Sequence, residues 1–292
     1  MRVLILGGNG MLGHKLVQIL GSEFETFSTI RRELPAVERF GIFDRERTIT
    51  NVDVTSERQV VDVIDKVRPD VVINCVGIIK QITSTPETMV QINTVLPRKL
   101  AELSAKYHFR LILISTDCVF AGSKGNYSEA DVPDADDIYG KTKLRGEVVA
   151  PNCLTIRTSM FGRELDSSHS LIEWFLSMRN QTISGFTRAI YSGFSTIVLS
   201  EIISSLIKDR ADLSGLYHIS SDPISKFELL ELVNDAFEAN VTIKPDDSLI
   251  IDRSLDSTKF RSETGFVPPT WPEMIKLMAA DTTPYESFHS SN

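Results

Sequence analysis

Val3–Gly13 reads VLILGGNGMLG, and this stretch decides the fold. Its four aliphatic residues predict a buried strand, and the segment from Met11 onward repeats apolar residues at helical spacing. Between the two, the glycines follow a Gly-x-x-Gly-x-x-Gly pattern. Glycine permits a tight turn and lets the backbone approach a pyrophosphate, whose charge the N-terminus of the next helix stabilises. The stretch therefore predicts a dinucleotide-binding turn, with cofactor contacts at Gly7, Gly10, Met11, Leu12 and Gly13.

The rest of the first half alternates strand-like and helix-like segments. Strands are expected at Arg2–Gly7, Phe24–Thr29, Asp70–Gly77 and Leu111–Ser115, and helices at Met11–Leu20, Val60–Val67 and Ile92–Tyr107. A Ser-x-x-Gln pattern from Ser56 to Gln59 predicts the start of the second helix. Strands that alternate with helices form parallel sheets with right-handed crossovers. We therefore expect an α/β fold with a Rossmann-type, doubly wound parallel sheet.

The second half of the chain is less regular. Helices are expected at Leu171–Met178, Val198–Ile207 and Phe227–Phe237, with short strands near Gly215–Ile219 and Thr242–Ile243. This pattern suits a smaller α/β lobe that closes over the sheet and binds substrate. We expect a cofactor-binding domain of residues 1–160, completed by about 187–217, and a substrate lobe of residues 161–186 and 218–280. The polar residues 281–292 are expected to form a flexible tail.

Composition argues against several classes of function. The chain of 292 residues carries a net charge of −8, which disfavours nucleic acid as a partner. No stretch approaches the roughly 20 apolar residues that cross a bilayer, and the N-terminus lacks the pattern of a secretory signal. The three cysteines are widely spaced, so neither a disulfide framework nor a metal site is indicated. We expect a cytoplasmic protein without membrane or nucleic-acid partners.

The end of the second predicted strand bears on the choice of cofactor. An acidic residue that binds the ribose of NAD is expected about 20 positions after the glycines, but Arg31 and Arg32 stand there instead. Guanidinium groups can hold the 2′-phosphate of NADP, so NADPH is favoured over NADH; a solvated basic turn is the alternative. Asp53 and Val54 follow the next apolar run. They are expected at the adenine edge, unless Asp53 serves only to cap a helix.

Tyr139 and Lys143 are four residues apart and share one face of a predicted helix. An ammonium close to a phenol lowers its pKa, which makes Tyr139 a candidate general acid for a carbonyl oxygen. Lys143 also suits contact with a nicotinamide ribose. Thr116 follows the apolar strand Leu111–Ser115, at the edge of a parallel sheet where ligands bind. A hydroxyl there can polarise a carbonyl, although these residues taken alone are typical of a turn.

These motifs, in this order, resemble those of the extended short-chain dehydrogenases/reductases, most closely the dTDP-4-dehydrorhamnose reductase group. The resemblance is carried by Gly7–Gly13, Pro69–Asn74, Asn93, Ser115–Phe120, Tyr127–Glu129, Tyr139–Glu147 and Gly215–His218. It implies NAD(P)H-dependent reduction of the 4-keto group of a nucleotide-linked 6-deoxy sugar, with Thr116, Tyr139 and Lys143 as catalytic residues. Cofactor contacts are then expected at Cys75, Val76, Gly77, Asn93, Tyr139 and Lys143. A homodimer is common for this fold.

Cys118 departs from the family pattern. The reductase group usually has Tyr at this place, and the similar 4,6-dehydratases have Glu as an acid, so dehydration is not expected. GDP-fucose synthases are similar here, because they use a Cys at this place and a His in the next segment to epimerise the sugar before reducing it. His169 stands in a comparable segment. One alternative is therefore a bifunctional epimerase/reductase that uses both residues; the other is a small apolar Cys118 and a helix-start His169.

Further residues are weaker candidates. Substrate contacts are expected at Cys118, Val119, Phe120, His169 and Arg253, and Arg163 is a second candidate partner for a pyrophosphate. His14, on the first helix, is expected to face solvent. A non-catalytic NADP-binding regulatory subunit is the last alternative, because the methionine adenosyltransferase β subunit resembles the same reductase group. The intact Thr116, Tyr139 and Lys143 favour an enzyme.

Overall fold

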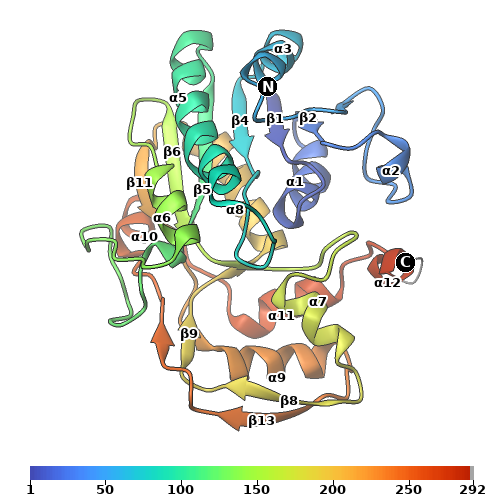
Figure 1. The fold of residues 1–292 in the computed structure, drawn as a ribbon, viewed down its shortest axis with the longest axis vertical. Helices are drawn as coiled ribbons and strands as arrows, with labels where there is room; N and C mark the ends of the chain where they lie inside the picture. The colour runs from blue at the N-terminus through green and yellow to red at the C-terminus, as the bar shows by residue number, and fades with distance from the viewer. Residues whose placement is uncertain (290–292) are drawn as a thin grey trace.

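Seven parallel strands form the central sheet of the computed structural model, which describes residues 1–289 (Figure 1). In order across the sheet they are β11 (Gly215–His218), β6 (Cys153–Thr158), β5 (Arg110–Thr116), β4 (Val71–Asn74), β1 (Arg2–Leu6), β2 (Glu25–Thr29) and β3 (Thr48–Ile49). Every neighbouring pair runs parallel. The order turns back between β1 and β4, the switch point at which open α/β sheets bind ligands. The predicted Rossmann-type fold is confirmed.

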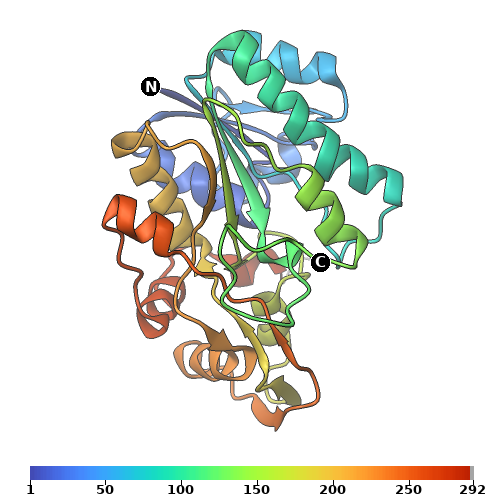
Figure 2. The same cartoon turned by 90° about the vertical axis from the view of Figure 1, so that its left-hand side faces the viewer.

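Each face of the sheet has its own layer of helices. The helices of the two layers are α1 (Met11–Gly21), α8 (Thr196–Asp209), α3 (Glu57–Val67) and α5 (Leu96–Tyr107). Val3 and Ile5 of β1 pack with α1 and α8, whereas Leu4 and Leu6 point the other way and pack with α3 and α5. Figure 2 shows the teal α5 and the gold α8 on opposite sides of the sheet. Because both faces are covered, the strands are almost continuously apolar.

The second half of the chain forms a smaller lobe below the carboxyl ends of the strands (Figure 1). Its strands pair as β7 (Met160–Phe161) with β10 (Phe194–Ser195), β8 (Thr182–Phe186) with β13 (Thr242–Asp246), and β9 (Ala189–Tyr191) between β12 (Ile224–Ser225) and β14 (Ile251–Asp252). Its helices include α7 (Leu171–Ser177), α9 (Lys226–Ala236) and α11 (Trp271–Ala279), while α10 (Thr258–Thr264) packs beside β11. The chain leaves the lobe for α8 and β11, which return to the central sheet.

Short helical segments connect the larger elements. They are α2 (Pro35–Glu38), α4 (Pro86–Val90), the π-helical turn Gln91–Val95, the 3₁₀ turn Asp117–Val119, α6 (Ile138–Arg145) and α12 (Tyr285–His289). The start of α3 follows the Ser-x-x-Gln prediction in part, because the Ser56 hydroxyl accepts a hydrogen bond from the N–H of Gln59 at 3.4 Å. The Gln59 side chain accepts from the N–H of Asp53 at 2.8 Å, so it fixes the preceding loop and does not complete a capping box.

The C-terminal segment is not the flexible tail that its polar composition predicts. Residues 281–289 pack on the fold, with Tyr285 and Phe288 of α12 buried among apolar side chains. The Tyr285 hydroxyl lies 2.8 Å from Nε2 of His14, which is fully buried on α1 and does not face solvent as expected. The remainder of the expected tail, residues 290–292, lies outside the described residues.

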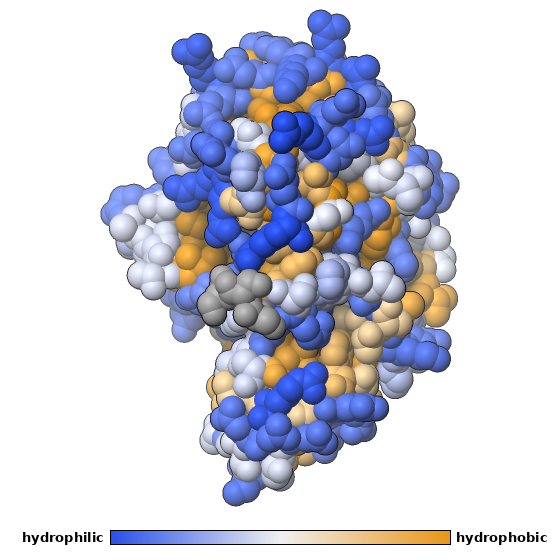
Figure 3. Space-filling view, turned by 90° about the vertical axis from the view of Figure 1, so that its right-hand side faces the viewer, coloured by the Kyte–Doolittle hydropathy of each residue, from blue (hydrophilic) through white to orange (hydrophobic). Residues whose placement is uncertain are grey.

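Within residues 1–289, no helix is both long and apolar enough to cross a bilayer. Figure 3 shows one face of the molecule, on which hydrophobic side chains appear in several separate patches among hydrophilic ones.

Candidate active site

The glycine turn has the geometry that the sequence predicts. Gly7 has a φ of +82°, a value that side chains disfavour, and a Cβ on Gly13 would lie 2.1 Å from the Gly7 carbonyl oxygen. Gly10 precedes α1 without any side-chain cap, and the first turn holds no acidic residue. The N–H groups at this end therefore remain available to an anion. Leu12 is buried in the core, so only its backbone can contact a cofactor.

The basic and acidic residues expected around the cofactor differ in how freely they can bind. Arg31 and Arg32 are both exposed, but the Arg32 guanidinium forms an ion pair with Asp166. The exposed Asp53 accepts hydrogen bonds from the N–H and hydroxyl of Thr55, at 3.0 and 2.8 Å, so its carboxylate is engaged in the turn before α3, whose capping residue is Ser56. Arg31 is therefore the better candidate for a 2′-phosphate. Val54 is half-buried beside α3.

The segment after β4 lies next to the glycine turn. A Cβ on Gly7 would touch Val76, and Gly77 is exposed. Burial raises the pKa of Cys75 to about 12, so this thiol stays protonated. Asn93 is buried, and its amide exchanges two 2.9 Å hydrogen bonds with the backbone of Ile78. Its side chain therefore holds the loop after β4 and has little capacity left for a cofactor.

Helix α6 carries Tyr139 and Lys143, so their four-residue spacing falls on a helix as predicted. Asp137 caps this helix by accepting the N–H of Gly140 at 2.9 Å. A Cβ on Gly140 would lie 2.2 Å from the Cys118 carbonyl oxygen, which explains why α6 approaches the end of β5 so closely. The Lys143 ammonium donates to the Ile114 carbonyl at 2.6 Å. The strand-end residues and the helix thus meet at one edge of the sheet.

Burial controls the ionisation of the groups at this edge. It raises the pKa of the Tyr139 phenol, an effect that Cys118 strengthens and the Thr116 hydroxyl opposes. Burial also lowers the pKa of Lys143 to about 8, although the Glu147 carboxylate offsets part of the loss. At neutral pH the phenol therefore keeps its proton, while the lysine remains largely cationic. These are the protonation states that a general acid and its cationic partner need.

A network of buried polar side chains lies next to this edge of the sheet. Glu147 accepts a hydrogen bond from Ser115 at 2.6 Å and forms a bidentate ion pair with Arg157, both bonds being 2.8 Å. Arg157 also lies 3.2 Å from the His218 ring. Glu147, just after α6, is thus bonded to strands β5 and β6, and these bonds hold Ser115, the neighbour of Thr116, in place.

Only some of the expected substrate residues lie together. Arg253 donates to the Phe120 carbonyl at 2.8 Å, and its charge is close enough to lower the pKa of Cys118. Burial and the neighbouring Asp117 nevertheless raise the pKa of Cys118 to about 11. The side chains of Val119 and Phe120 are completely buried by apolar packing, so only their backbone can contact a substrate.

Two other expected anion or sugar contacts lie elsewhere. Arg163 is buried and forms ion pairs with Glu173 at 2.5 Å and Glu286 at 3.0 Å, so its charge is already neutralised. His169 is exposed before α7 and has no hydrogen bond or ion pair within the described part of the chain. Neither residue is brought to Cys118 by any contact among residues 1–289.

Sequence reasoning missed Lys80, Asp137 and Tyr191 at this edge. Lys80, in the loop after β4, forms a 2.6 Å ion pair with Asp137. The Tyr191 hydroxyl of β9 is buried without a hydrogen-bond partner among residues 1–289. Burial raises the pKa of this phenol, and the nearby Asp117 adds to that rise. For Lys80, its place just after a central strand was an available signal. For Tyr191 no signal existed, because its neighbours come from a distant part of the chain.

The Rossmann-type sheet, the glycine turn and these edge residues define the class of the extended short-chain dehydrogenases/reductases. The family model described as RmlD substrate binding domain matches residues 1–283, and the chain belongs to this family. A dTDP-4-dehydrorhamnose reductase of Aggregatibacter actinomycetemcomitans is 26% identical over 96% of this chain and 98% of its own. A solved structure from Bacillus anthracis str. Ames, a dTDP-4-dehydrorhamnose reductase in complex with NADP, is 24% identical, covers 95% of this chain and 98% of its own, and has a TM-score of 0.78.

A relative of a different kind matches only in part. The methionine adenosyltransferase 2 subunit beta of Mus musculus is 33% identical, but over 50% of this chain and 41% of its own. This chain therefore spans less than half of that protein. The likeness to the reductases extends over nearly the whole of both chains.

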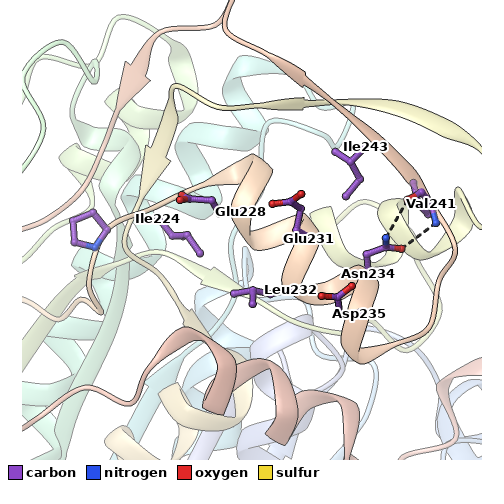
Figure 4. A pocket seen from close by; sticks show the side chains of 9 residues that line it. Ile224, Glu228, Glu231, Leu232, Asn234, Asp235, Val241 and Ile243 are labelled. Carbon is purple, nitrogen blue, oxygen red and sulfur yellow. Dashed lines mark hydrogen bonds between the residues drawn. The ribbon is translucent and has the colours of Figure 1, made fainter.

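A pocket away from these residues lies on the lobe, along α9 and β13 (Figure 4). Its volume is about 700 Å³, and Glu228, Glu231 and Asp235 line it. The Asn234 amide in its wall is already bonded twice to the backbone of Val241, at 3.0 Å each. None of the expected site residues lines this pocket, and its acidic side chains repel phosphates. A nucleotide therefore does not fit here.

Proposed function

We propose that this protein reduces the 4-keto group of a nucleotide-linked 6-deoxy sugar with NADPH. One observation carries the proposal: α6 brings Tyr139 and Lys143 to the strand end that holds Thr116, beside the glycine turn. The membership in the RmlD family and the full-length likeness to a dTDP-4-dehydrorhamnose reductase support it. The substrate class rests on these relatives, while the chemistry rests on the residues.

The glycine turn suits NADPH. A Cβ on Gly10 would meet only the Gly7 carbonyl oxygen, at 3.4 Å, so the space in front of α1 is open to a pyrophosphate. Arg31 would hold the 2′-phosphate, and the segment Cys75–Gly77 would lie under the nicotinamide side of the site. When bound, NADPH supplies a hydride to the keto carbon.

The chain's own residues supply the proton and the orientation. The Thr116 hydroxyl donates to Asp117 at 3.0 Å in the free protein, and on substrate binding it would turn to donate to the keto oxygen and hold it towards Tyr139. The Tyr139 phenol gives its proton to that oxygen, so hydride and proton together convert the ketone into an alcohol. The Lys143 ammonium stabilises the phenolate that is left and binds the nicotinamide ribose. Solvent then returns a proton to Tyr139.

The lobe completes the site in this proposal. We assign residues 161–186 and 218–280 to substrate binding and the sheet residues to cofactor binding. Of the expected segment 187–217, α8 and β11 complete the cofactor-binding sheet, whereas β9 and β10 belong to the lobe. Cys118 and Arg253 face the sugar and its diphosphate, because the Arg253 charge lies beside Cys118 and its Nε is fixed by Phe120. A homodimer stays a prediction for this chain.

The two alternative functions have less support. An epimerase needs a base beside the carbonyl, but the Cys118 thiol has a pKa of about 11 and His169 is exposed with no contact to it. A regulatory subunit would not need Thr116, Tyr139 and Lys143 together at one edge. Its resemblance to this chain also covers only half of the sequence.

The test is NADPH oxidation, followed at its absorbance band, with a panel of 4-keto-6-deoxy sugars on dTDP, UDP, GDP and CDP. We expect rapid turnover with one member and a single alcohol as product. Tight NADPH binding without turnover of any sugar would contradict the proposal and favour the regulatory subunit. NMR of the product in deuterated water separates simple reduction from epimerisation, because only the latter exchanges carbon-bound protons beside the keto group.

The cofactor choice has its own test, in which two neighbouring arginines serve as probe and control. Arg31→Ala is expected to weaken NADPH binding by about tenfold or more and NADH binding little, since only NADPH carries the 2′-phosphate. Arg32→Ala is the control, because Arg32 is already paired with Asp166. Equal losses for the two cofactors in Arg31→Ala would remove the phosphate contact from the proposal.

A further inference from the structure

A lysine that no motif contains lies against the catalytic tyrosine. The Lys80 ammonium sits 5.8 Å from the centre of the Tyr139 ring, within the range of a cation–π contact. The side chain is 38% exposed, so it is reachable from the open side of the site. Lys80 comes from the loop after β4, at the switch point of the sheet, whereas Tyr139 comes from α6.

One carboxylate joins this lysine to the catalytic helix. Oδ2 of Asp137 forms the 2.6 Å ion pair with Lys80, and Oδ1 accepts the N–H of Gly140 at 2.9 Å. The same side chain therefore caps α6 and holds Lys80. Because Tyr139 lies between Asp137 and Gly140 in the sequence, a shift of Lys80 would be transmitted directly to the phenol.

Lys143 does not occupy the same place. Its ammonium donates to the Ile114 carbonyl at 2.6 Å, and the charges that act on it are those of Glu147 and Cys75. Lys80 instead acts on Cys118, whose pKa it helps to lower. The two lysines therefore approach the edge from different sides.

We propose that Lys80 is a further positioning residue for the reduction, which rests on the proposed function above. Through Asp137 it fixes the start of α6, and through its charge above the ring it stabilises the negative charge that Tyr139 acquires when it gives up its proton. A cation is attracted to a neutral phenol ring, and more strongly to a phenolate. The pair therefore favours the state that follows proton transfer.

The charged and titratable groups around Tyr139 come from every element that surrounds it. They are Lys80 from the loop after β4, Asp117 and Cys118 from the end of β5, Asp137 and Lys143 from α6, and Arg253 from the segment after β14. Lys80 belongs neither to the proposed triad nor to the residues assigned to the sugar, so its replacement leaves both sets intact.

The first experiment compares Lys80→Met, Lys80→Arg and Lys141→Met in the full-length protein. We expect Lys80→Met to lower kcat by about 10- to 100-fold with a KM change of less than about threefold, since the charge acts after substrate binding. The pH limb that Tyr139 sets in the reverse oxidation should move to higher pH. Lys80→Arg should recover most of kcat. Lys141 is an exposed lysine of α6 that donates to the Asp136 carbonyl, and its replacement should change nothing.

A merely structural lysine would give a different pattern. Lys80→Met would then lower the Tm and leave the pH profile in place, which would overturn the proposal. If that variant does not fold, Lys80→Gln replaces it, because glutamine keeps a polar side chain but carries no charge. A kcat and a pH profile unchanged in Lys80→Gln would also overturn the proposal.

A second readout does not depend on turnover, so it separates this proposal from the proposed function. Iodoacetamide alkylation of Cys118 at fixed pH, measured by mass spectrometry, reports how strongly the Lys80 charge acts at the site. We expect alkylation to slow by about 2- to 10-fold in Lys80→Met and to be unchanged in Lys141→Met. Unchanged or faster alkylation in Lys80→Met would refute the electrostatic role, even if no sugar in the panel is reduced.

Discussion

Polar groups are buried both at the catalytic edge, which we define as the end of β5 with Thr116 and the start of α6 with Tyr139, and in the C-terminal clamp. The two regions differ in whether every buried polar group has a partner. In the clamp, which we define as His14, Lys15, Asp281, Thr283 and Tyr285, the ionisable groups all have partners: Lys15 pairs with Asp281 at 2.5 Å, and His14 bonds to the Gly10 carbonyl at 2.9 Å and to Tyr285 at 2.8 Å. At the catalytic edge, the Tyr191 hydroxyl is buried with no partner in the described part of the chain.

This difference separates structure from function. A paired polar group gains nothing further from a ligand, because its hydrogen bonds are already made. A buried group with spare bonding capacity costs stability in the free protein and can recover that cost when a ligand arrives. The clamp ties the last described residues to the helix behind the glycine turn, whereas at the edge the Tyr191 hydroxyl still has bonding capacity.

The largest expected effect is a loss of turnover when the proton donor at the catalytic edge is removed. Tyr139→Phe should lower turnover by roughly 10²- to 10⁴-fold, because the proton donor is lost, while NADPH affinity and Tm stay nearly unchanged. Steady-state kinetics and cofactor titration measure the two quantities. Full activity in this variant would show that another group supplies the proton.

The next largest effect is a loss of stability when the ion pair of the clamp is removed. Asp281→Ala leaves the Lys15 ammonium, whose side chain is 6% exposed, without its counter-charge. The free energy of unfolding should fall by about 3 to 5 kcal/mol, as measured by urea denaturation. The double variant Lys15→Met/Asp281→Leu should recover most of the loss, because apolar groups need no partner. A loss below about 1 kcal/mol in Asp281→Ala would mean that the clamp is open in solution.

The clamp also predicts a pH dependence. Burial lowers the pKa of His14 from 6.5 to about 4, so between these values the unfolded chain binds a proton that the folded chain does not. Stability from this group is therefore present above pH 6.5 and is lost as the pH falls towards 4. The loss amounts to about 3 kcal/mol.

His14→Gln isolates this contribution, because glutamine does not titrate. Denaturation at pH 7 and pH 4.5 should show a smaller acid-induced loss in the variant than in the wild type. His169→Gln, at an exposed position, is the matched control and should keep the full loss. The same loss in both variants would assign the acid sensitivity to other groups.

The smallest expected effect is a change in the free energy of unfolding when the unpaired hydroxyl at the catalytic edge is removed. Tyr191→Phe removes an unpaired buried hydroxyl, so the free energy of unfolding should rise by about 1 kcal/mol or stay constant. The matched control is Tyr217→Phe, whose hydroxyl donates to Glu263 at 2.7 Å and should cost about 1 kcal/mol. A clear loss of stability in Tyr191→Phe would reveal a partner for this hydroxyl.

The sequence by itself determined the local features of this protein. Strand β1, the glycine turn and α1 follow from consecutive residues, and so does the pairing of Tyr139 with Lys143 on one helix. The parallel, doubly wound sheet followed from the alternation of strands and helices, because crossovers obey one hand. Local pattern and backbone chemistry suffice for each of these.

Only the tertiary structure decided which residues from distant parts of the chain lie in contact. Val119 and Phe120 look like substrate residues in a motif, but packing against Tyr127 and Leu255 buries them. His14 and the polar C-terminus look solvated, but 271 residues apart they bond to each other. Lys80 reaches Tyr139 only because β4 and α6 meet at the same edge. Burial and charge pairing depend on distances in space, and no sequence spacing encodes those.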